Sequence, residues 1–400
     1  MMKDKKIIVG VTGGIAAYKA AELVRIFVKA GAEIRVAMTV NATRFIAPLT
    51  LEALSGNKVV WDMFAPETHP ISHITWGQES DLVIIAPATA NFIAKMAHGI
   101  ADDFLSTMVL ATTAKILVCP AMNSQMFENS ATRENIKLIN ERGCLVMEPG
   151  EGELACHTEG PGRLPDPEDI AEQARAILTE KDLSGLRLLV TAGPTIESMD
   201  PVRYISNRST GKMGYALARA ASMRGASVTL VSGPAALSPP DGIKFHGVKS
   251  AEEMRRVVFD NHGDSDVIIK AAAVSDYRPG ESSLQKIKKG ADTLSIDLVK
   301  NPDILAELGK AKAEHGYILV GFAAETENLL ENATEKLRNK NLDIIVLNDV
   351  TREDAGFEAD TNLVKIIQGD GKREDLPLMS KDDVANQILD RIKALRKSQA

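Results

Sequence analysis

The stretch from Lys5 to Thr39, KKIIVGVTGGIAAYKAAELVRIFVKAGAEIRVAMT, decides the fold class. Its first eight residues form an apolar, Val- and Ile-rich run that ends at Gly13 and Gly14, a pattern typical of a buried strand followed by a tight turn. Residues 16–31 then carry apolar side chains at helical spacing, and residues 33–39 return to a strand pattern. Together the three segments predict one β-α-β unit.

The same alternation continues along the rest of the chain. Further strands are expected at residues 81–88, 115–121, 144–150, 187–193, 227–233, 266–274, 317–325 and 342–348. Helices are expected over residues 99–113, 135–143, 167–180, 211–225, 251–261, 301–314 and 329–340. Strands that are apolar throughout are buried on both faces, as in a parallel sheet. We therefore predict an α/β protein with two doubly wound, Rossmann-like domains whose sheets are mainly parallel.

Three segments interrupt this pattern. Residues 150–167, GEGELACHTEGPGRLPDP, are rich in Gly and Pro and predict a long loop or flap. Residues 181–186, KDLSGL, are polar and precede a new strand, so we expect domains at residues 1–182 and 183–400. Residues 194–210 separate a strand from its helix by far more than the usual few residues, which favours a functional loop.

Composition excludes several classes of protein. The chain has 400 residues, a net charge of -7, 44% hydrophobic and 25% charged residues, which is ordinary for a soluble globular protein. The acidic balance argues against a general nucleic-acid or anionic-membrane binder, and no apolar run reaches the roughly 20 residues that span a bilayer. The 3 cysteines are scattered and lack metal-ligand spacing, so we expect neither a disulfide framework nor a zinc site. We expect the protein to work in a reducing cytoplasm.

In open α/β sheets, ligands bind beyond the carboxyl ends of the strands. The first such loop contains Gly10, Gly13 and Gly14, which is not the GxGxxG pattern, and the second strand ends in Thr39 where a dinucleotide domain usually has an acidic residue. These features favour a mononucleotide phosphate held by backbone amides, as in FMN, over NAD. A glycine turn needed only for tight packing is the alternative.

Other polar residues follow the next strands. Ala88–Asn91 (ATAN) and Ser106 could pair with the edge of a flat ring, and Asn123 could both donate and accept hydrogen bonds, although all of these are also good helix caps. His73 suits a base, yet a lone histidine is more often structural. Cys156 lies in the Gly/Pro-rich segment, where it could act as a proton donor over a bound substrate.

In the second half, GKM at residues 211–213 fails the Walker A pattern, because Ser206 and Met213 stand where that motif needs Gly and Ser or Thr. The loop that contains Arg203, Asn207, Arg208, Ser209 and Thr210 is suited to an anionic group. Lysines at 286–289 (KIKK), 300, 336 and 340 could gather around a triphosphate, or could form a solvated face.

The motifs in combination resemble the bifunctional phosphopantothenoylcysteine decarboxylase and phosphopantothenate-cysteine ligase family of bacterial coenzyme A synthesis, over nearly the whole chain. The first half is similar to flavin-dependent cysteine decarboxylases through TGGIAAYK, SHI, APATAN, PAMNSQM and ACHTEGPGRL. The second half is similar to CTP-dependent ligases through TAGPTIESMDPVRYISNRSTGKMG, AAAVSDYRP, KIKK and GFAAET.

For residues 1–182 this resemblance implies an FMN-dependent decarboxylase with a flavin-binding cysteine-decarboxylase fold. The implied FMN contacts are Gly13, Gly14, Ile15, Thr39, Pro87, Ala88, Thr89, Ala90, Asn91, Ser106 and Ala121. The resemblance further implies oxidation of the substrate thiol to a thioaldehyde before carbon dioxide is lost, with His73 as base or electrostatic partner, Asn123 orienting the substrate and Cys156 donating a proton.

For residues 183–400 the resemblance implies ligation of cysteine to phosphopantothenate through an acyl-cytidylate, with CTP and magnesium. Asn207 would stabilise the acyl-cytidylate, Arg203 would hold a substrate anion, and Lys286 would assist activation. The implied CTP contacts are Asp276, Lys286, Pro302, Asp303, Ile304, Leu305, Phe322, Lys336 and Lys340.

The resemblance also implies a cytoplasmic homo-oligomer, a dodecamer built from decarboxylase trimers and ligase dimers. Two departures from the family pattern are Phe127, where Trp is usual, and His157-Thr158 directly after Cys156, where Gly is more usual. A flavin-binding regulatory protein is the competing hypothesis, because some relatives of this fold inhibit phosphatases; the complete ligase half argues against it.

Overall fold

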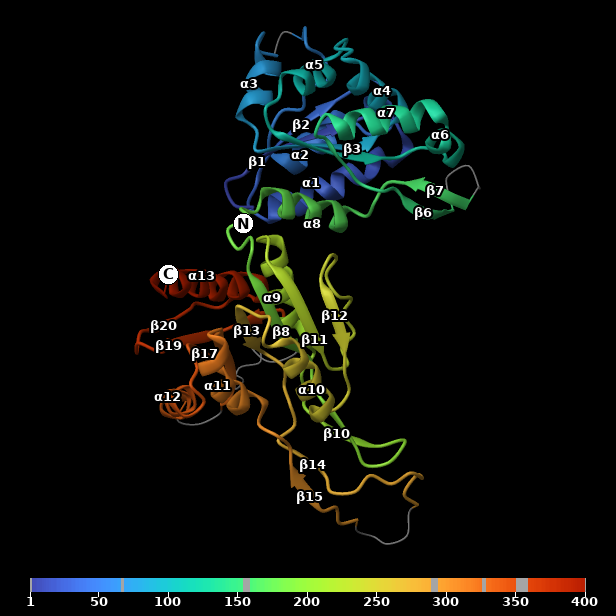
Figure 1. Ribbon diagram of the computed structural model, residues 1–400. Coiled ribbons are helices and arrows are strands. Elements are labelled where there is room, and N and C mark those ends of the chain that lie inside the picture. The colour runs from blue at the N-terminus through green and yellow to red at the C-terminus, as the bar shows by residue number, and fades with distance from the viewer. Residues whose placement is uncertain are drawn as a thin grey trace. The chain divides into compact units, whose positions relative to one another are not determined.

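The computed structural model describes residues 2–65, 68–153, 159–288, 294–325, 329–349 and 359–399. The chain divides into two compact units, unit 1 with residues 1–179 and unit 2 with residues 180–400 (Figure 1).

Unit 1 is built on a five-stranded parallel sheet with the strand order β2-β1-β3-β4-β5. The strands are β1 (Lys6–Val11), β2 (Glu33–Met38), β3 (Leu82–Ala88), β4 (Lys115–Pro120) and β5 (Leu145–Val146). The α-helices are α1 (Lys19–Lys29), α2 (Pro48–Ser55), α3 (Ser72–Glu79), α4 (Ala90–His98), α5 (Phe104–Ala111), α6 (Ser124–Glu128), α7 (Ser130–Glu141) and α8 (Pro167–Leu178). Short 3-10 helices are η1 (Ile15–Tyr18) and η2 (Ala42–Arg44).

Helices cover both faces of this sheet because successive strand side chains point to opposite sides. Val9 and Ile84 pack with α1, α2 and α8 on one face, and Ile8 and Val83 pack with α4 and α5 on the other. Figure 1 shows α1 and α8 on one side of the strands and α4 and α5 on the other. Every residue of β3 is buried. The first half is therefore a doubly wound α/β domain, as predicted.

Unit 2 has an eight-stranded sheet with the order β12-β11-β8-β13-β16-β17-β19-β20, parallel except for β19 and β20 at one edge. Its strands are β8 (Arg187–Ala192), β11 (Ser227–Ser232), β12 (Lys244–Gly247), β13 (Val267–Lys270), β16 (Ile318–Glu325), β17 (Ile344–Asp349), β19 (Val364–Gln368) and β20 (Arg373–Asp375). The helices are α9 (Lys212–Met223), α10 (Ala251–Asn261), α11 (Ile304–His315), α12 (Leu329–Asn339) and α13 (Lys381–Gln399). Helices α9 and α13 pack on one face and α10, α11 and α12 on the other, which confirms the second doubly wound domain.

Smaller strand pairs complete both units. The pairs are β6 (Gly150–Glu153) with β7 (Glu159–Arg163), β9 (Ile196–Ser198) with β10 (Tyr204–Ser206), β14 (Tyr277–Pro279) with β15 (Leu298–Lys300), and β18 (Thr361–Asn362) with β21 (Met379–Ser380). Figure 1 shows β10, β14 and β15 extending away from the large sheet of unit 2 as an arm. We call residues 196–206, 277–288 and 294–300 the arm.

The structure corrects three predicted elements. Residues 150–167 are not wholly loop, because β6 and β7 pair in antiparallel fashion on either side of residues 154–158, which lie outside the described residues. The helix expected over 99–113 begins at Phe104, because the side chain of Asp103 caps it. The strand expected over 266–274 ends at Lys270, so residues 271–274 lie beyond the sheet edge.

Within the described parts of the chain, no helix is long and apolar enough to cross a membrane.

Candidate active sites

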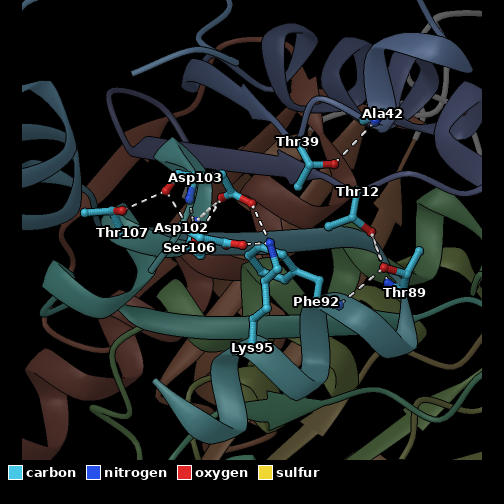
Figure 2. A network of polar contacts seen from close by, with 10 residues as sticks. All are labelled: Thr12, Thr39, Ala42, Thr89, Phe92, Lys95, Asp102, Asp103, Ser106 and Thr107. Carbon is cyan, nitrogen blue, oxygen red and sulfur yellow. Dashed lines mark hydrogen bonds and ion pairs between the residues drawn. The ribbon is translucent and has the colours of Figure 1, made fainter. Parts of the chain in front are cut away.

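Thr12 joins the loops that follow β1 and β3. Its hydroxyl donates a hydrogen bond to the carbonyl of Pro87 at 2.7 Å and accepts one from the backbone N–H of Thr89 at 3.0 Å. Thr12 is 1% exposed, so both bonds are made away from solvent. Figure 2 shows the side chains of Thr12 and Thr89 pointing toward one another. The two loops therefore form one rim at the carboxyl edge of the sheet.

Two glycines shape this rim. A Cβ on Gly13 would lie 2.5 Å from the Cβ of Asn41, so a side chain at position 13 would displace the loop after β2. A Cβ on Gly14 would lie 3.4 Å from the methyl group of Thr89. The glycine turn thus serves tight packing, and it also leaves the backbone accessible where η1 begins.

A cavity of about 560 Å³ opens at the rim. The predicted residues that line it are Gly13, Gly14, Ile15, Thr89, Ala121 and Asn123. Thr89 caps α4 by accepting from the N–H of Phe92 at 3.4 Å, and Asn123 caps α6 by accepting from the N–H of Gln125 at 2.9 Å. Each of these two residues therefore both caps a helix and lines the cavity, because the helix begins at the cavity wall.

The remaining predicted cofactor residues do not line this cavity: Thr39, Pro87, Ala88, Ala90, Asn91 and Ser106. Ser106 shares a capping box with Asp103, whose carboxylate accepts the Ser106 N–H at 2.8 Å. Lys95 lies 2.5 Å from Asp102 and 3.1 Å from Asp103, so it anchors α4 to the start of α5 (Figure 2). Burial lowers the pKa of Lys95, but the hydrogen bonds to the two carboxylates outweigh it and raise the pKa above its ordinary value.

The predicted catalytic residues of unit 1 are not all placed. His73 lies in the first turn of α3, outside the cavity lining, and its Nδ1 is buried with no hydrogen-bond partner among the described residues. Cys156 lies outside the described residues, between β6 and β7. Gly162 and Arg163 of strand β7 form part of the cavity wall. The N–H of Met122, which also lines the cavity, donates to the carbonyl of Gly162 at 2.9 Å and so holds β7 in place.

Unit 2 contains a second cavity, of about 860 Å³, at the carboxyl edge of its sheet. The predicted residues that line it are Asn207, Asp276, Pro302, Asp303, Ile304, Leu305, Phe322, Lys336 and Lys340. The side chain of Asn207 donates to the carbonyl of Ala273 at 3.0 Å, just beyond β13. The oxygen atoms of Asp303 accept the Ala306 N–H at 3.0 Å, capping α11, and lie 2.8 Å from the ammonium of Lys340. Burial raises the pKa of Asp303, but these contacts outweigh it and hold the pKa below its usual value.

The structure separates two predicted residues from this group. Lys286 and Arg203 lie on the arm and do not line the cavity. The guanidinium of Arg203, expected to hold a substrate anion, instead donates to the carbonyl of Ile287 at 2.8 Å. Lys286 is exposed.

Sequence reasoning missed several polar residues of the second cavity. They are Lys212, Lys270, Asn348, Asn362 and Lys381. Lys212 lies 2.6 Å from Asp360, and Lys381 is 7% exposed and donates to the carbonyl of Ala359. The sequence around Lys270 could have indicated its position, because a charged residue directly after three apolar strand residues marks the end of a strand, where ligands bind.

Comparison with known proteins identifies the family. Residues 183–395 match the family described as "DNA/pantothenate metabolism flavoprotein C-terminal domain", and residues 1–179 match the family "Flavoprotein". The chain is 48% identical to the coenzyme A biosynthesis bifunctional protein CoaBC of Bacillus subtilis (strain 168), over 99% of this chain and 98% of the relative. The chain belongs to the family of bifunctional coenzyme A biosynthesis proteins.

A second member of this family, from Escherichia coli (strain K12), is 47% identical over 98% of this chain and 97% of its own. The crystal structure of the C-terminal domain of the coenzyme A biosynthesis bifunctional protein CoaBC shares 42% identity, covering 55% of this chain and 100% of that chain with a TM-score of 0.47. The two relatives, each matched over nearly its whole length, confirm the family membership and the bifunctional role in coenzyme A biosynthesis predicted from the sequence.

Proposed function

We propose that the chain catalyses two consecutive steps of coenzyme A biosynthesis. The second predicted domain, residues 183–400, which falls in unit 2, ligates cysteine to phosphopantothenate with CTP. The first predicted domain, residues 1–182, which contains unit 1, decarboxylates the resulting phosphopantothenoylcysteine to phosphopantetheine with FMN. The observation that carries the proposal is that the described residues of each unit form a large cavity, lined by several of the residues expected for its reaction.

The cavity of unit 1 fits a flavin mononucleotide in its size and its lining. The accessible backbone at Gly13 and Gly14 and the hydroxyl of Thr89 suit a phosphate, and Ala121 leaves room for a flat ring. FMN, when bound, would supply the two-electron oxidation of the substrate thiol and its later reversal.

The residues of unit 1 would handle the substrate and its protons. Asn123, at the cavity wall, would orient the substrate carboxylate and amide through its side-chain amide. The unpaired Nδ1 of His73 favours a role as base or electrostatic partner, because a buried ring nitrogen without a partner is costly. Cys156 would protonate the enethiolate formed after carbon dioxide leaves.

Charge in the cavity of unit 2 supports the use of a triphosphate. Among the described residues, seven basic side chains line it, against the two carboxylates of Asp276 and Asp303. The basic residues are Arg208, Lys212, Lys270, Lys300, Lys336, Lys340 and Lys381. Such an excess attracts polyphosphate and stabilises charge on the leaving pyrophosphate.

The ligation would proceed in two displacements. The carboxylate oxygen of phosphopantothenate attacks the α-phosphorus of CTP, and pyrophosphate leaves. The amine of cysteine then attacks the acyl carbon, and CMP leaves with the bonding electrons. Asn207, held at the cavity wall by its bond to Ala273, is suited to stabilise the acyl-cytidylate. Magnesium would be held mainly by the nucleotide, since no group of three metal-ligating side chains exists among the described residues.

We also propose that the protein works in the cytoplasm as a homo-oligomer, a dodecamer by family resemblance. Large apolar side chains such as Leu49 and Phe64, which are 72% and 87% exposed, favour subunit contacts in unit 1.

Two half-reactions test the assignment. Purified protein is given phosphopantothenate, cysteine, CTP and magnesium for ligation, and in a separate assay phosphopantothenoylcysteine and FMN for decarboxylation. We expect Asn207→Asp to abolish amide formation, because a carboxylate would face the Ala273 carbonyl, and to leave decarboxylation intact. Normal amide formation by that variant would refute the division of the two activities between the units.

A further inference from the structure

Lys270 is the last residue of β13, in the middle of the sheet of unit 2. It pairs with Thr191 of β8 and Gly321 of β16. Because side chains alternate along a strand, Lys270 lies on the same face as Ile268, which packs in the core formed with α10 and α11. Lys270 is only partly exposed and lines the large cavity, so its ammonium group faces the space where α11 begins.

The charge of Lys270 has no carboxylate partner at ion-pair distance in the described residues. Its ammonium donates to the carbonyl of Ala272 at 3.1 Å. Asp303, whose charge acts on Lys270, is already engaged with Lys340 and with the backbone at the start of α11. An ammonium group withdrawn from bulk water is costly unless an anion neutralises it. In this cavity that anion is most simply supplied by a ligand.

We propose that Lys270 is a substrate-contacting residue of the ligase, whose ammonium group pairs with a phosphate group of a substrate bound in the cavity. This inference rests on the proposed ligase function. Both substrates of that reaction other than cysteine carry phosphate, so the nucleotide and phosphopantothenate are the two possible sources.

Binding of a phosphate at this position should be coupled to protonation of the Lys270 amine. Burial, followed by the positive charge of Lys340, lowers the pKa of Lys270 to about 8, while Asp303 and Asp276 act in the opposite direction. Lys300 and Lys336, which also line the cavity, add positive charge. A bound phosphate favours the charged amine and raises this pKa. Because about half of the amines are already protonated at pH 8, binding at that pH takes up a fraction of a proton, and affinity falls as the pH rises above about 8.

The test compares wild-type protein with Lys270→Met, which keeps the length of the side chain without its charge. Lys310→Met is the matched control, since Lys310 is exposed on α11 and does not line the cavity. Titration calorimetry measures binding of CTP with magnesium, and of phosphopantothenate, at pH 8 in two buffers of different ionisation enthalpy. We expect Lys270→Met to bind one of these ligands about tenfold more weakly or worse, and without the proton uptake of the wild type. Lys310→Met should match the wild type.

The melting temperature of the free protein separates a contact from a structural role. Removal of an unpaired charge should leave the melting temperature of Lys270→Met unchanged or higher, and should reduce only the rise caused by the ligand. Weaker CTP binding assigns the phosphate to the nucleotide, and weaker phosphopantothenate binding assigns it to the acyl substrate. If wild type and Lys270→Met bind CTP and phosphopantothenate with equal affinity and equal proton uptake, the proposed role of Lys270 is wrong, while the ligase function is unaffected. Absence of binding of either ligand to the wild type would overturn the ligase function as well.

Discussion

The carboxylate of Asp200 accepts a hydrogen bond from the backbone N–H of Ile287 at 3.2 Å, across two segments of the arm. The guanidinium of Arg203 donates a second hydrogen bond across the arm, to the carbonyl of Ile287 at 2.8 Å. The other oxygen of Asp200 accepts the N–H groups of Val202 and Arg203, each at 2.7 Å. The side chain of Asp200 is wholly buried, so these bonds fix the backbone next to Lys286, the lysine expected to assist activation.

Replacing Asp200 with Ala should reduce the kcat of ligation by about tenfold or more, because Ile287 loses its acceptor and Lys286 its fixed position. Asp200→Asn keeps one acceptor oxygen and should retain part of the activity. Decarboxylation of supplied phosphopantothenoylcysteine, assigned to the other unit, is the internal control. Ligation at the wild-type rate in Asp200→Ala would show that the arm contact has no role in the reaction.

A change at Thr12 should weaken FMN binding. Thr12→Val keeps the shape of the side chain but leaves the Pro87 carbonyl and the Thr89 N–H without their buried partner, at a cost of about 1–3 kcal/mol. FMN fluorescence quenching measures the dissociation constant, and Thr113→Val, at an exposed threonine, is the control. An unchanged dissociation constant in Thr12→Val would mean that this rim does not hold the cofactor.

Much of the fold was predictable because it depends on local patterns. The alternation of apolar strands with amphipathic helices predicts helices packed around a parallel sheet, and the glycines at 13 and 14 marked the first rim. Helix α13 was missed although Val384, Ile388 and Ile392 recur at helical spacing and are fully buried. The hairpin of β6 and β7 was missed because glycine-rich strands carry little β-propensity.

The sites were harder to predict than the fold. Nine of the residues predicted for unit 2 line its cavity, and they come from β16, α11, α12 and connecting loops rather than from one local pattern. Lys212 and Asp360 form an ion pair although they are 148 residues apart in the sequence, so no local sequence pattern could have predicted it. The arm that separates Lys286 and Arg203 from the cavity likewise depends on long-range pairing of short strands, which spacing along the sequence does not reveal.

Cys156→Ser should stop the decarboxylase after carbon dioxide is lost. A serine hydroxyl is a far weaker acid than a thiol, so the enethiolate would lack its proton donor and an oxidised, decarboxylated product should accumulate. Mass spectrometry of the products distinguishes this species from phosphopantetheine. Full turnover to phosphopantetheine in the variant would end the assignment of Cys156 as proton donor.

Unit 2 should lose stability in acid through the ion pair of Asp182 and Arg224. The hydrogen bond from Arg224, at 2.8 Å, together with Lys393, holds the pKa of Asp182 well below its usual value. Such a group contributes stability above the unfolded-state pKa near 4, and the contribution is lost as the pH falls below about 4.

Asp182→Asn should therefore cost about 2 kcal/mol at pH 7 and should flatten the fall in melting temperature as the pH drops below about 4. The control is Asp241→Asn, at an exposed aspartate. The same pH dependence in Asp182→Asn and wild type would assign the acid sensitivity to other groups.

If one chain carries both reactions, the purified protein should convert phosphopantothenate and cysteine to phosphopantetheine by itself. It is incubated with FMN, phosphopantothenate, cysteine, CTP and magnesium, and the acyl products are followed by mass spectrometry over time. We expect phosphopantetheine, with phosphopantothenoylcysteine as a transient. Arrest at phosphopantothenoylcysteine would contradict the decarboxylase assignment, and the absence of any acyl product while FMN is bound would contradict the enzyme itself.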